Sequence, residues 1–167
     1  MKQAGGRIGA VLGLALALAT FGVAGCSRGT QPHGGNSGLA GERYDLSKDE
    51  ERGGHTLTRH VGRTDEELRE RLRDEPNISA ASTWTDRETA EETIAEALRA
   101  ERGRIQSWMR RGYPRANLTL HYEARRDIGR SLRQGETEPV RCRDAVIVLR
   151  ADGPDTLYVL TAYPEAR

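Results

Sequence analysis

The segment after residue 50 carries hydrophobic residues at helical spacing. A leucine and a valine four positions apart predict a short helix over residues 57–61, which Gly62 ends. Thr64 and Glu67 then match a capping box, in which each side chain binds the backbone of the other residue at the start of a helix. We therefore expect a second helix over residues 65–73, with two leucines on its buried side.

A second capping-box pattern, Thr85 with Glu88, opens a longer amphipathic segment. Its hydrophobic residues recur at spacings of three, four and seven, which predicts one long helix that ends at Gly112 and bends at Gly103. The expected core positions of this helix are Ala90, Ile94, Ala97, Leu98, Ile105, Trp108 and Met109.

The pattern changes to that of strands after Pro114. Hydrophobic and polar residues alternate over 118–122, while 145–149 and 157–163 are two apolar runs joined by a turn at 151–154. Helices followed by strands predict an α+β fold, with N-terminal helices packed on a C-terminal antiparallel sheet.

The N-terminus has the pattern of an export signal. Two basic residues precede an apolar run that is too short to span a bilayer, and Val23 to Cys26 closes the run. This pattern resembles a bacterial lipobox and implies a lipoprotein signal peptide at 1–25 with Cys26 as the lipidated residue. Such a chain is exported and lipid-anchored to the outer face of the cell membrane or to the cell envelope. An ordinary secretory signal and a buried hydrophobic helix are the alternatives.

A flexible tether is expected at 26–41, because this segment is rich in Gly, Ser, Pro, Asn and Gln. The globular domain then covers 42–167. With Cys26 lipidated, Cys142 has no partner for an intramolecular disulfide. We expect Cys142 to be a small buried hydrophobic residue and not a nucleophile.

The nearly equal numbers of basic and acidic residues exclude a protein whose whole surface binds nucleic acid non-specifically. The chain has 26 basic and 25 acidic residues, and removal of 1–25 takes away two of the basic ones. Binding to an anionic polymer must therefore rest on a local cluster of basic residues. Lys2 and Lys48 are the only lysines, so arginine supplies this charge.

Two of the four histidines, His55 and His60, lie close together and are candidates for acid/base chemistry near neutral pH. On a regular helix they would be separated by about 140° around the axis. Either the segment bends so that both enter one cleft, or one is catalytic and the other structural. A zinc site is not expected, since no further ligands occur at the required spacing.

Three more polar residues are ambiguous from the pattern alone. Thr161 and Tyr163 are two apart in an expected strand, so both point to one side, with Leu157 and Val159 behind them. They could form a cleft surface or be an ordinary β-former and an edge aromatic. Arg71 could be solvated like its neighbours on the helix or turned inward.

Several blocks of sequence together resemble the bacterial RNase A-like toxin domain found at the C-termini of contact-dependent growth inhibition proteins. The blocks are Gly53-Gly54-His55-Thr56, residues 59–64, Leu68 with Arg71-Leu72, residues 80–86, Thr89-Ala90-Glu91 and Thr161-Ala162-Tyr163-Pro164. They cover nearly all of the chain beyond the tether and imply an RNase A-like fold. The chain departs from the family pattern in three ways: Trp84 stands where a smaller aromatic is more usual, Cys142 is unpaired, and a lipobox and short tether replace a very large filamentous delivery protein.

The resemblance implies a metal-independent endoribonuclease without a cofactor. It places His60, Arg71, Thr161 and Tyr163 in the active site, with His55 as a second imidazole. The expected reaction is transesterification by the RNA 2′-OH to a 2′,3′-cyclic phosphate. Expected partners are the RNA substrate and an immunity protein, and the domain is expected to be a monomer. The alternatives are an inactive surface lipoprotein that acts as a binding module, and an exoenzyme that degrades RNA for nutrition.

Overall fold

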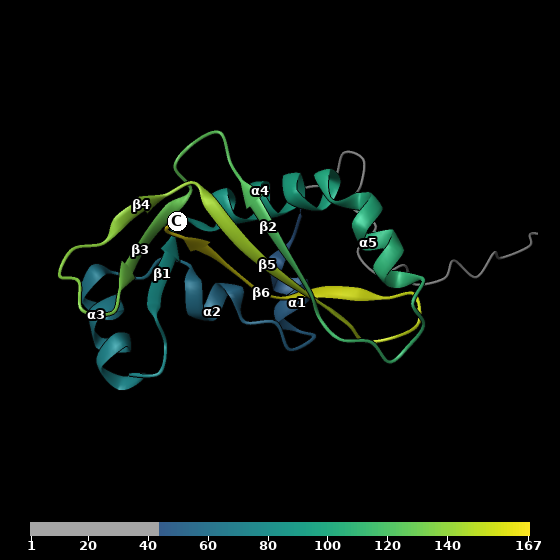
Figure 1. Ribbon diagram of the computed structural model, residues 1–167, viewed down its shortest axis with the longest axis horizontal. Coiled ribbons are helices and arrows are strands. Elements are labelled where there is room, and N and C mark those ends of the chain that lie inside the picture. Colours follow the sequence, from purple (N-terminus) through teal and green to yellow (C-terminus); the bar gives the residue numbers. More distant parts are fainter. Residues whose placement is uncertain (1–43) are drawn as a thin grey trace, which may run out of the picture. The chain divides into compact units, whose positions relative to one another are not determined.

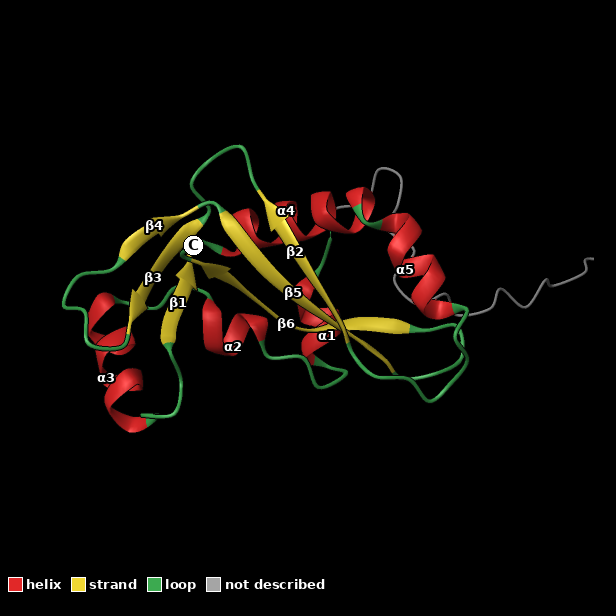
Figure 2. Cartoon of the chain, in the orientation of Figure 1, coloured by secondary structure: helices red, strands yellow, loops and turns green. Residues whose placement is uncertain are grey.

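A computed structural model describes residues 44–167. The predicted signal peptide, Cys26 and the tether lie outside the described residues. In chain order the described elements are α1 (Leu46–Glu50), α2 (Thr56–His60), α3 (Asp65–Asp74), β1 (Ala80–Trp84), α4 (Arg87–Ala100), α5 (Arg102–Met109), β2 (Leu118–Glu123), β3 (Gly129–Arg133), β4 (Val140–Cys142), β5 (Asp144–Ala151) and β6 (Leu157–Glu165) (Figures 1 and 2). The α+β prediction is confirmed.

The strands form two antiparallel sheets of three strands each, in the orders β1-β3-β4 and β2-β5-β6. The second sheet contains the three strands that the hydrophobic pattern predicts. The hydrophobic pattern does not predict the first sheet, because β1 consists of four small residues followed by Trp84, and β3 of glycine, serine and arginine around one leucine. These short strands form because neighbouring elements cover them, and their own sequence has no apolar alternation.

The predicted helix starts and ends are partly correct. At α3 both hydrogen bonds of the predicted capping box between Thr64 and Glu67 are present. At α4 the N-cap is Asp86, whose carboxylate accepts from the backbone N–H of Thr89, so the expected cap at Thr85 is wrong. The long helix is broken at Glu101 into α4 and α5, and it does not continue through a bend at Gly103.

A β-bulge interrupts the pairing of β6 with β5. Val148 pairs with Thr161, whereas Leu149 pairs with Val159, so Leu160 is an extra residue on β6. An inserted residue reverses which face of the sheet each later side chain meets. The two ends of β6 therefore have opposite alternation.

The bulge decides the environment of Thr161 and Tyr163. Val159 before the bulge and Ala162 after it are both fully buried in the main core. Thr161 and Tyr163 therefore point to the opposite face, away from Val159 and Leu157. From the sequence alone, these four residues are expected on one side of the strand. That expectation is wrong, because a simple alternation of sides takes no account of an inserted residue.

Residues 44–167 form two hydrophobic cores. The larger core packs the β2-β5-β6 sheet against α1, α4 and α5 and includes Leu46, Trp84, Ile94, Trp108, Leu120, Ile147, Leu149 and Val159. The smaller core joins α3 to β1 and β3 through Leu68, Leu72, Ala81 and Leu132. Burying one leucine side chain contributes roughly 1.5–3 kcal/mol to stability. The predicted core role of Trp108 is confirmed.

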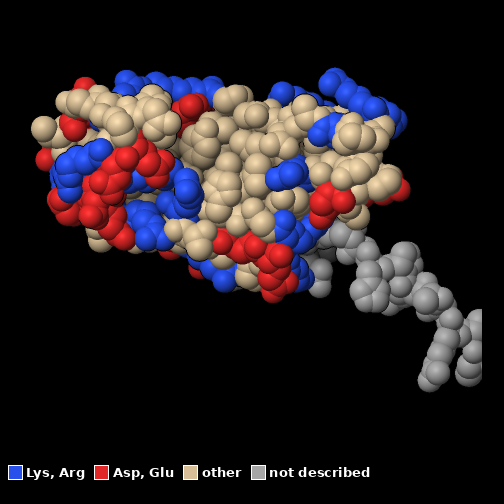
Figure 3. Space-filling view, turned by 90° about the horizontal axis from the view of Figure 1, so that it is seen from below, with Lys and Arg blue, Asp and Glu red and all other residues tan. Residues whose placement is uncertain are grey.

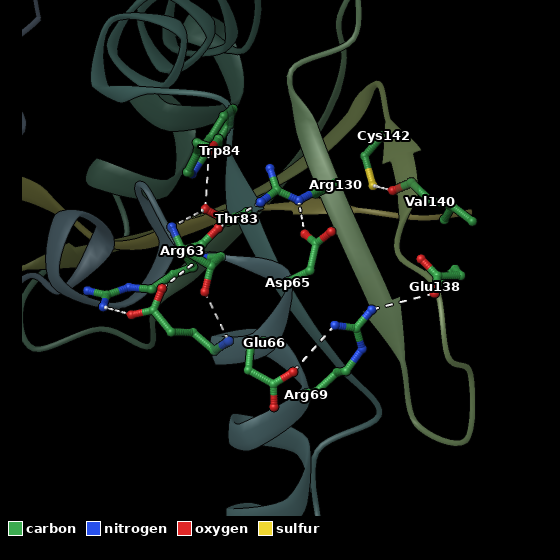
Figure 4. A network of polar contacts seen from close by, with 12 residues as sticks. Arg63, Asp65, Glu66, Arg69, Thr83, Trp84, Arg130, Glu138, Val140 and Cys142 are labelled. Atoms are coloured by element: carbon green, nitrogen blue, oxygen red, sulfur yellow. Dashed lines mark hydrogen bonds and ion pairs between the residues drawn. The ribbon is translucent and has the colours of Figure 1, made fainter.

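Polar contacts fix α3 on the β1-β3-β4 sheet (Figure 4). The Arg130 guanidinium forms an ion pair with Asp65 and donates to the Arg63 carbonyl at 2.9 Å. The Arg63 backbone N–H in turn donates to Thr83 Oγ1 at 3.0 Å. These contacts join the start of α3 to the two strands beside it.

The two sheets approach each other closely at Gly129 of β3. A Cβ at this position would lie 2.3 Å from the Thr83 carbonyl oxygen and 2.6 Å from Cγ of Pro164. Only glycine permits this distance between β3 and the end of β6. The end of β6 is therefore held next to the first sheet, and the C-terminus lies near β1 and β3 (Figure 1).

Candidate active site

His60 lies at the end of α2 and is buried, with 7% of its surface exposed. Its ring is 5.3 Å from the Tyr163 ring, centroid to centroid, and its Nδ1 is 3.3 Å from the Ser82 carbonyl oxygen. A donor at Nδ1 makes this contact a hydrogen bond and leaves Nε2 as the acceptor of the neutral ring. The histidine thus meets one residue from each of β1 and β6.

His55 is the N-cap of α2, and its φ of −149° and ψ of 27° lie outside the helical region. It is half-buried and lines the same cleft as His60. The helical-wheel separation does not apply, because the helix begins only at Thr56. The spacing of the two histidines left two alternatives open. In the structure both histidines lie at one cleft.

The strand segment that carries Thr161 and Tyr163 is fixed through the residue between them. The Ala162 N–H donates to Thr56 Oγ1 at 2.9 Å, and the Ala162 carbonyl accepts from Trp84 Nε1 at 2.9 Å. Both partners are buried. Side chains of α2 and β1 therefore bind the backbone of β6 along the edge of this strand that does not pair with β5.

The start of α2 is tied to the bulge as well. The His55 N–H donates to the Leu160 carbonyl at 3.0 Å. Gly54 makes this approach possible, since a Cβ there would lie 2.7 Å from the Val159 carbonyl oxygen. The Gly-His-Thr block and the Thr-Ala-Tyr block, more than 100 residues apart in the sequence, are thus directly bonded.

Arg71 of α3 is turned inward, unlike Arg73 on the same helix, whose side chain is 61% exposed. Arg71 Nε lies 3.4 Å from Glu75 Oε1. Its Nη1 is buried and has no hydrogen-bond partner among the described residues. The guanidinium of Arg71, which lines the cleft, therefore carries a hydrogen-bond donor that no described residue satisfies.

All five predicted residues line one cleft of about 550 Å³. It lies between α2, the face of β1 and β3 that points away from the smaller core, and the end of β6. Further polar residues that the sequence patterns did not single out complete its wall: Arg59, Asn77, Ser79, Ser82, Ser131, Arg133 and Glu165. Arg59 could have been found from its place beside His60, but Ser82, Ser131 and Arg133 lie on the unpredicted strands.

The electrostatics of the cleft favour neutral imidazoles. Burial, with a smaller contribution from the Arg71 charge, lowers the pKa of His60 to about 4. Burial and the Arg59 charge also lower the pKa of His55. Burial and the nearby Glu165 raise the pKa of the Tyr163 phenol, which therefore keeps its proton at neutral pH.

Other candidates lie outside this cleft. Cys142 is buried as predicted, and burial raises the pKa of its thiol to about 11, so it is not a thiolate. His121 lies on β2 with its side chain 49% exposed. In residues 44–167 no three metal-ligating side chains come together, and none of the helices described there has the length and apolar character needed to span a bilayer.

We expect the Thr56 hydroxyl to stabilise the fold at this junction. Replacing Thr56 by valine keeps the shape but leaves the buried Ala162 N–H without an acceptor, which costs about 1–3 kcal/mol. The free energy of unfolding measured by urea denaturation should fall by this amount, while Thr56→Ser retains most of it. A valine variant as stable as the original protein would contradict the role of this bond.

The α+β domain thus gathers two imidazoles, an arginine, a threonine and a tyrosine in one cleft, a set of groups suited to proton transfer and to binding a phosphate. Residues 54–164 match the family model of the bacterial CdiA-CT RNase A domain. The chain belongs to this family, and the domain is a ribonuclease toxin domain of this type.

A solved structure agrees with the family. The chain is similar to the crystal structure of a CdiA-CT/CdiI complex from Y. kristensenii 33638, with 32% sequence identity and a TM-score of 0.61. The alignment covers 68% of this chain and 100% of that one. A search of curated proteins found no match.

Proposed function

We propose that this domain cleaves RNA without a metal, by attack of a 2′-OH on the adjacent phosphodiester, and leaves a 2′,3′-cyclic phosphate. The observation that carries the proposal is the convergence of His55, His60, Arg71, Thr161 and Tyr163 on one cleft. This reaction needs a base for the 2′-OH, an acid for the departing 5′ oxygen and positive charge for the phosphorane. The cleft offers a candidate group for each task.

His60 is the proposed base. Its lowered pKa keeps the imidazole neutral at physiological pH, which is the form that accepts a proton. The Ser82 carbonyl is placed to orient the ring through Nδ1, and the Tyr163 ring packs beside it. Nε2 is then the nitrogen that receives the proton of the 2′-OH.

Arg71 is the proposed ligand of the developing phosphorane charge. Its buried Nη1 is without a protein partner, so binding a phosphate oxygen satisfies a donor that is otherwise unpaired. Its positive charge also contributes to the low pKa of His60, and a bound phosphate would offset that effect. One residue would thus bind substrate and help burial to keep the base neutral.

His55 is the proposed second proton-transfer group. It is less buried than His60, and the negative charge of a bound phosphate would raise its pKa so that it can donate to the 5′ oxygen. Thr161 Oγ1 is buried and without a partner in the described structure, which supports a hydrogen bond to a phosphate oxygen or a base edge. The protonated Tyr163 phenol would donate to phosphate or stack on a base.

The test of this proposal is cleavage of RNA in the presence of EDTA. The purified protein should degrade RNA and spare DNA of the same sequence, because DNA has no 2′-OH nucleophile. Catalytically inactive variants serve as the control for contaminating nucleases. Failure to cleave varied RNAs, or cleavage only after a divalent metal is added, would contradict the mechanism.

The biological setting is proposed from the family and from the N-terminal sequence. The CdiA-CT/CdiI complex supports a CdiI-like immunity protein as a partner, and inhibition of RNA cleavage by the product of a neighbouring reading frame would test it. Export and anchoring through Cys26 stay a prediction. A Cys26→Ala variant that still fractionates with membranes would disprove it.

A further inference from the structure

Arg133 lies at the far end of β3, on the side of the strand that forms the cleft. Leu132 points into the smaller core, so Ser131 and Arg133 share the opposite face. Both residues line the cleft together with Thr161 and Tyr163. Arg133 has no place in the proposed chemistry, and its function is therefore open.

The strand register gives the position of Arg133 relative to the reaction centre. Ser82, whose carbonyl contacts His60, pairs with Ser131, and Ala80 pairs with Arg133. Two residues along a strand correspond to about 7 Å. Arg133 is therefore one step farther along the same wall of the cleft.

The donors of Arg133 are largely available. Nη2 donates to the Ala166 carbonyl at 2.7 Å, which orients the guanidinium. Arg133 forms no ion pair with any carboxylate in residues 44–167, whereas Arg141 and Arg143 on the neighbouring strand and loop both pair with Asp127. An oriented guanidinium with unpaired donors suits a phosphate ligand.

Charge distinguishes this cleft from the one beside it. Three arginines and a single carboxylate, Glu165, line the cleft that holds His60. The adjoining cleft, which also contains Arg133, is lined by four arginines and six carboxylates. Basic (blue) and acidic (red) residues lie intermixed on the face shown in Figure 3. Because that face has no broad positive field, only a local cluster of arginines can attract an anion.

We infer that Arg133 binds the phosphate next to the scissile one, and that single-stranded RNA leaves the protein at this point without entering the acidic adjoining cleft. This inference rests on the proposed function for the position of the scissile phosphate. It adds a binding site for a second phosphate, and it predicts that substrate length matters.

The experiment measures the binding of two uncleavable 2′-O-methyl RNA probes to the purified protein. One probe is a dinucleotide with a single phosphodiester, and the other is a tetranucleotide with phosphates on both sides of the central one. Arg133→Ala should weaken tetranucleotide binding by about tenfold. It should also reduce the slope of log affinity against log salt by about 0.7, the value for one phosphate contact on a single strand.

Dinucleotide binding should be unchanged in Arg133→Ala, which shows that loss of the Ala166 contact has not distorted the cleft. The matched control is Arg150→Ala, an exposed arginine of β5 that lines neither cleft, and it should behave like the original protein. Equal losses for both probes, or original affinity and salt slope for the tetranucleotide, would overturn the inference. Intact length-dependent binding by a protein that does not cleave RNA would overturn the proposed function alone.

Discussion

Replacing His60 by glutamine lowers the rate of RNA cleavage by about 10²–10⁴-fold, the usual contribution of one catalytic proton transfer. Glutamine is preferable to alanine here. His60 is buried against Tyr163, and a truncated side chain would leave a cavity that lowers stability as well as activity. The measurement is kcat/KM on an RNA oligonucleotide, with unfolding followed separately.

The control for His60 is His121→Gln, which removes an exposed histidine that does not line the cleft. His121 reaches the cleft only through a 4.0 Å contact with Glu165, so cleavage should be nearly unchanged. The pH profile provides a second readout. With a His60 pKa of about 4 in the free protein, kcat/KM should decline on the acid side only as the pH approaches that value. A glutamine variant with undiminished activity would remove His60 from the mechanism.

Replacing Arg71 by lysine lowers kcat/KM by about 10–100-fold, although the charge is retained. A hydrogen bond to a charged group contributes about 1.5–3 kcal/mol, and each 1.36 kcal/mol corresponds to a factor of ten in rate. Lysine has no planar pair of donors that could replace the guanidinium edge carrying Nη1. The measurement is steady-state cleavage of the RNA oligonucleotide used for His60.

The matched variant is Arg73→Lys on the same helix, with an exposed side chain outside the cleft. It should cleave RNA at the original rate. If Arg71→Lys retained full activity, charge alone would be sufficient at this position, and the proposed contact with a phosphate oxygen through Nη1 would be wrong.

Features decided by neighbouring residues could be predicted from the sequence. The capping box of Thr64 and Glu67 is present because its geometry involves only one turn of chain. The β-branched run of β5 forms a strand in the core because it is apolar on both faces. These local rules were sufficient for the α+β fold, for all three strands of one sheet and for the start of α3.

Features decided by distant residues were not visible in the pattern. β1 and β3 form a sheet because α3 covers one face of it, not because their residues alternate. The Leu160 bulge turns Thr161 and Tyr163 to the cleft, and it is held by a backbone hydrogen bond from His55 at the start of α2. Only the family resemblance indicated these two residues, because a family motif includes residues that are brought together by contacts distant in the sequence.

The chemical structure of the product ends shows whether the 2′-OH of RNA is the nucleophile. A short RNA of defined sequence is incubated with the protein in EDTA, and the fragments are weighed by mass spectrometry. We expect a 2′,3′-cyclic phosphate on the upstream fragment, a free 5′-OH on the downstream one, and no cut beside a nucleotide that carries a single 2′-deoxy substitution. A 5′-phosphate on the downstream fragment, or cleavage at the 2′-deoxy position, would contradict it.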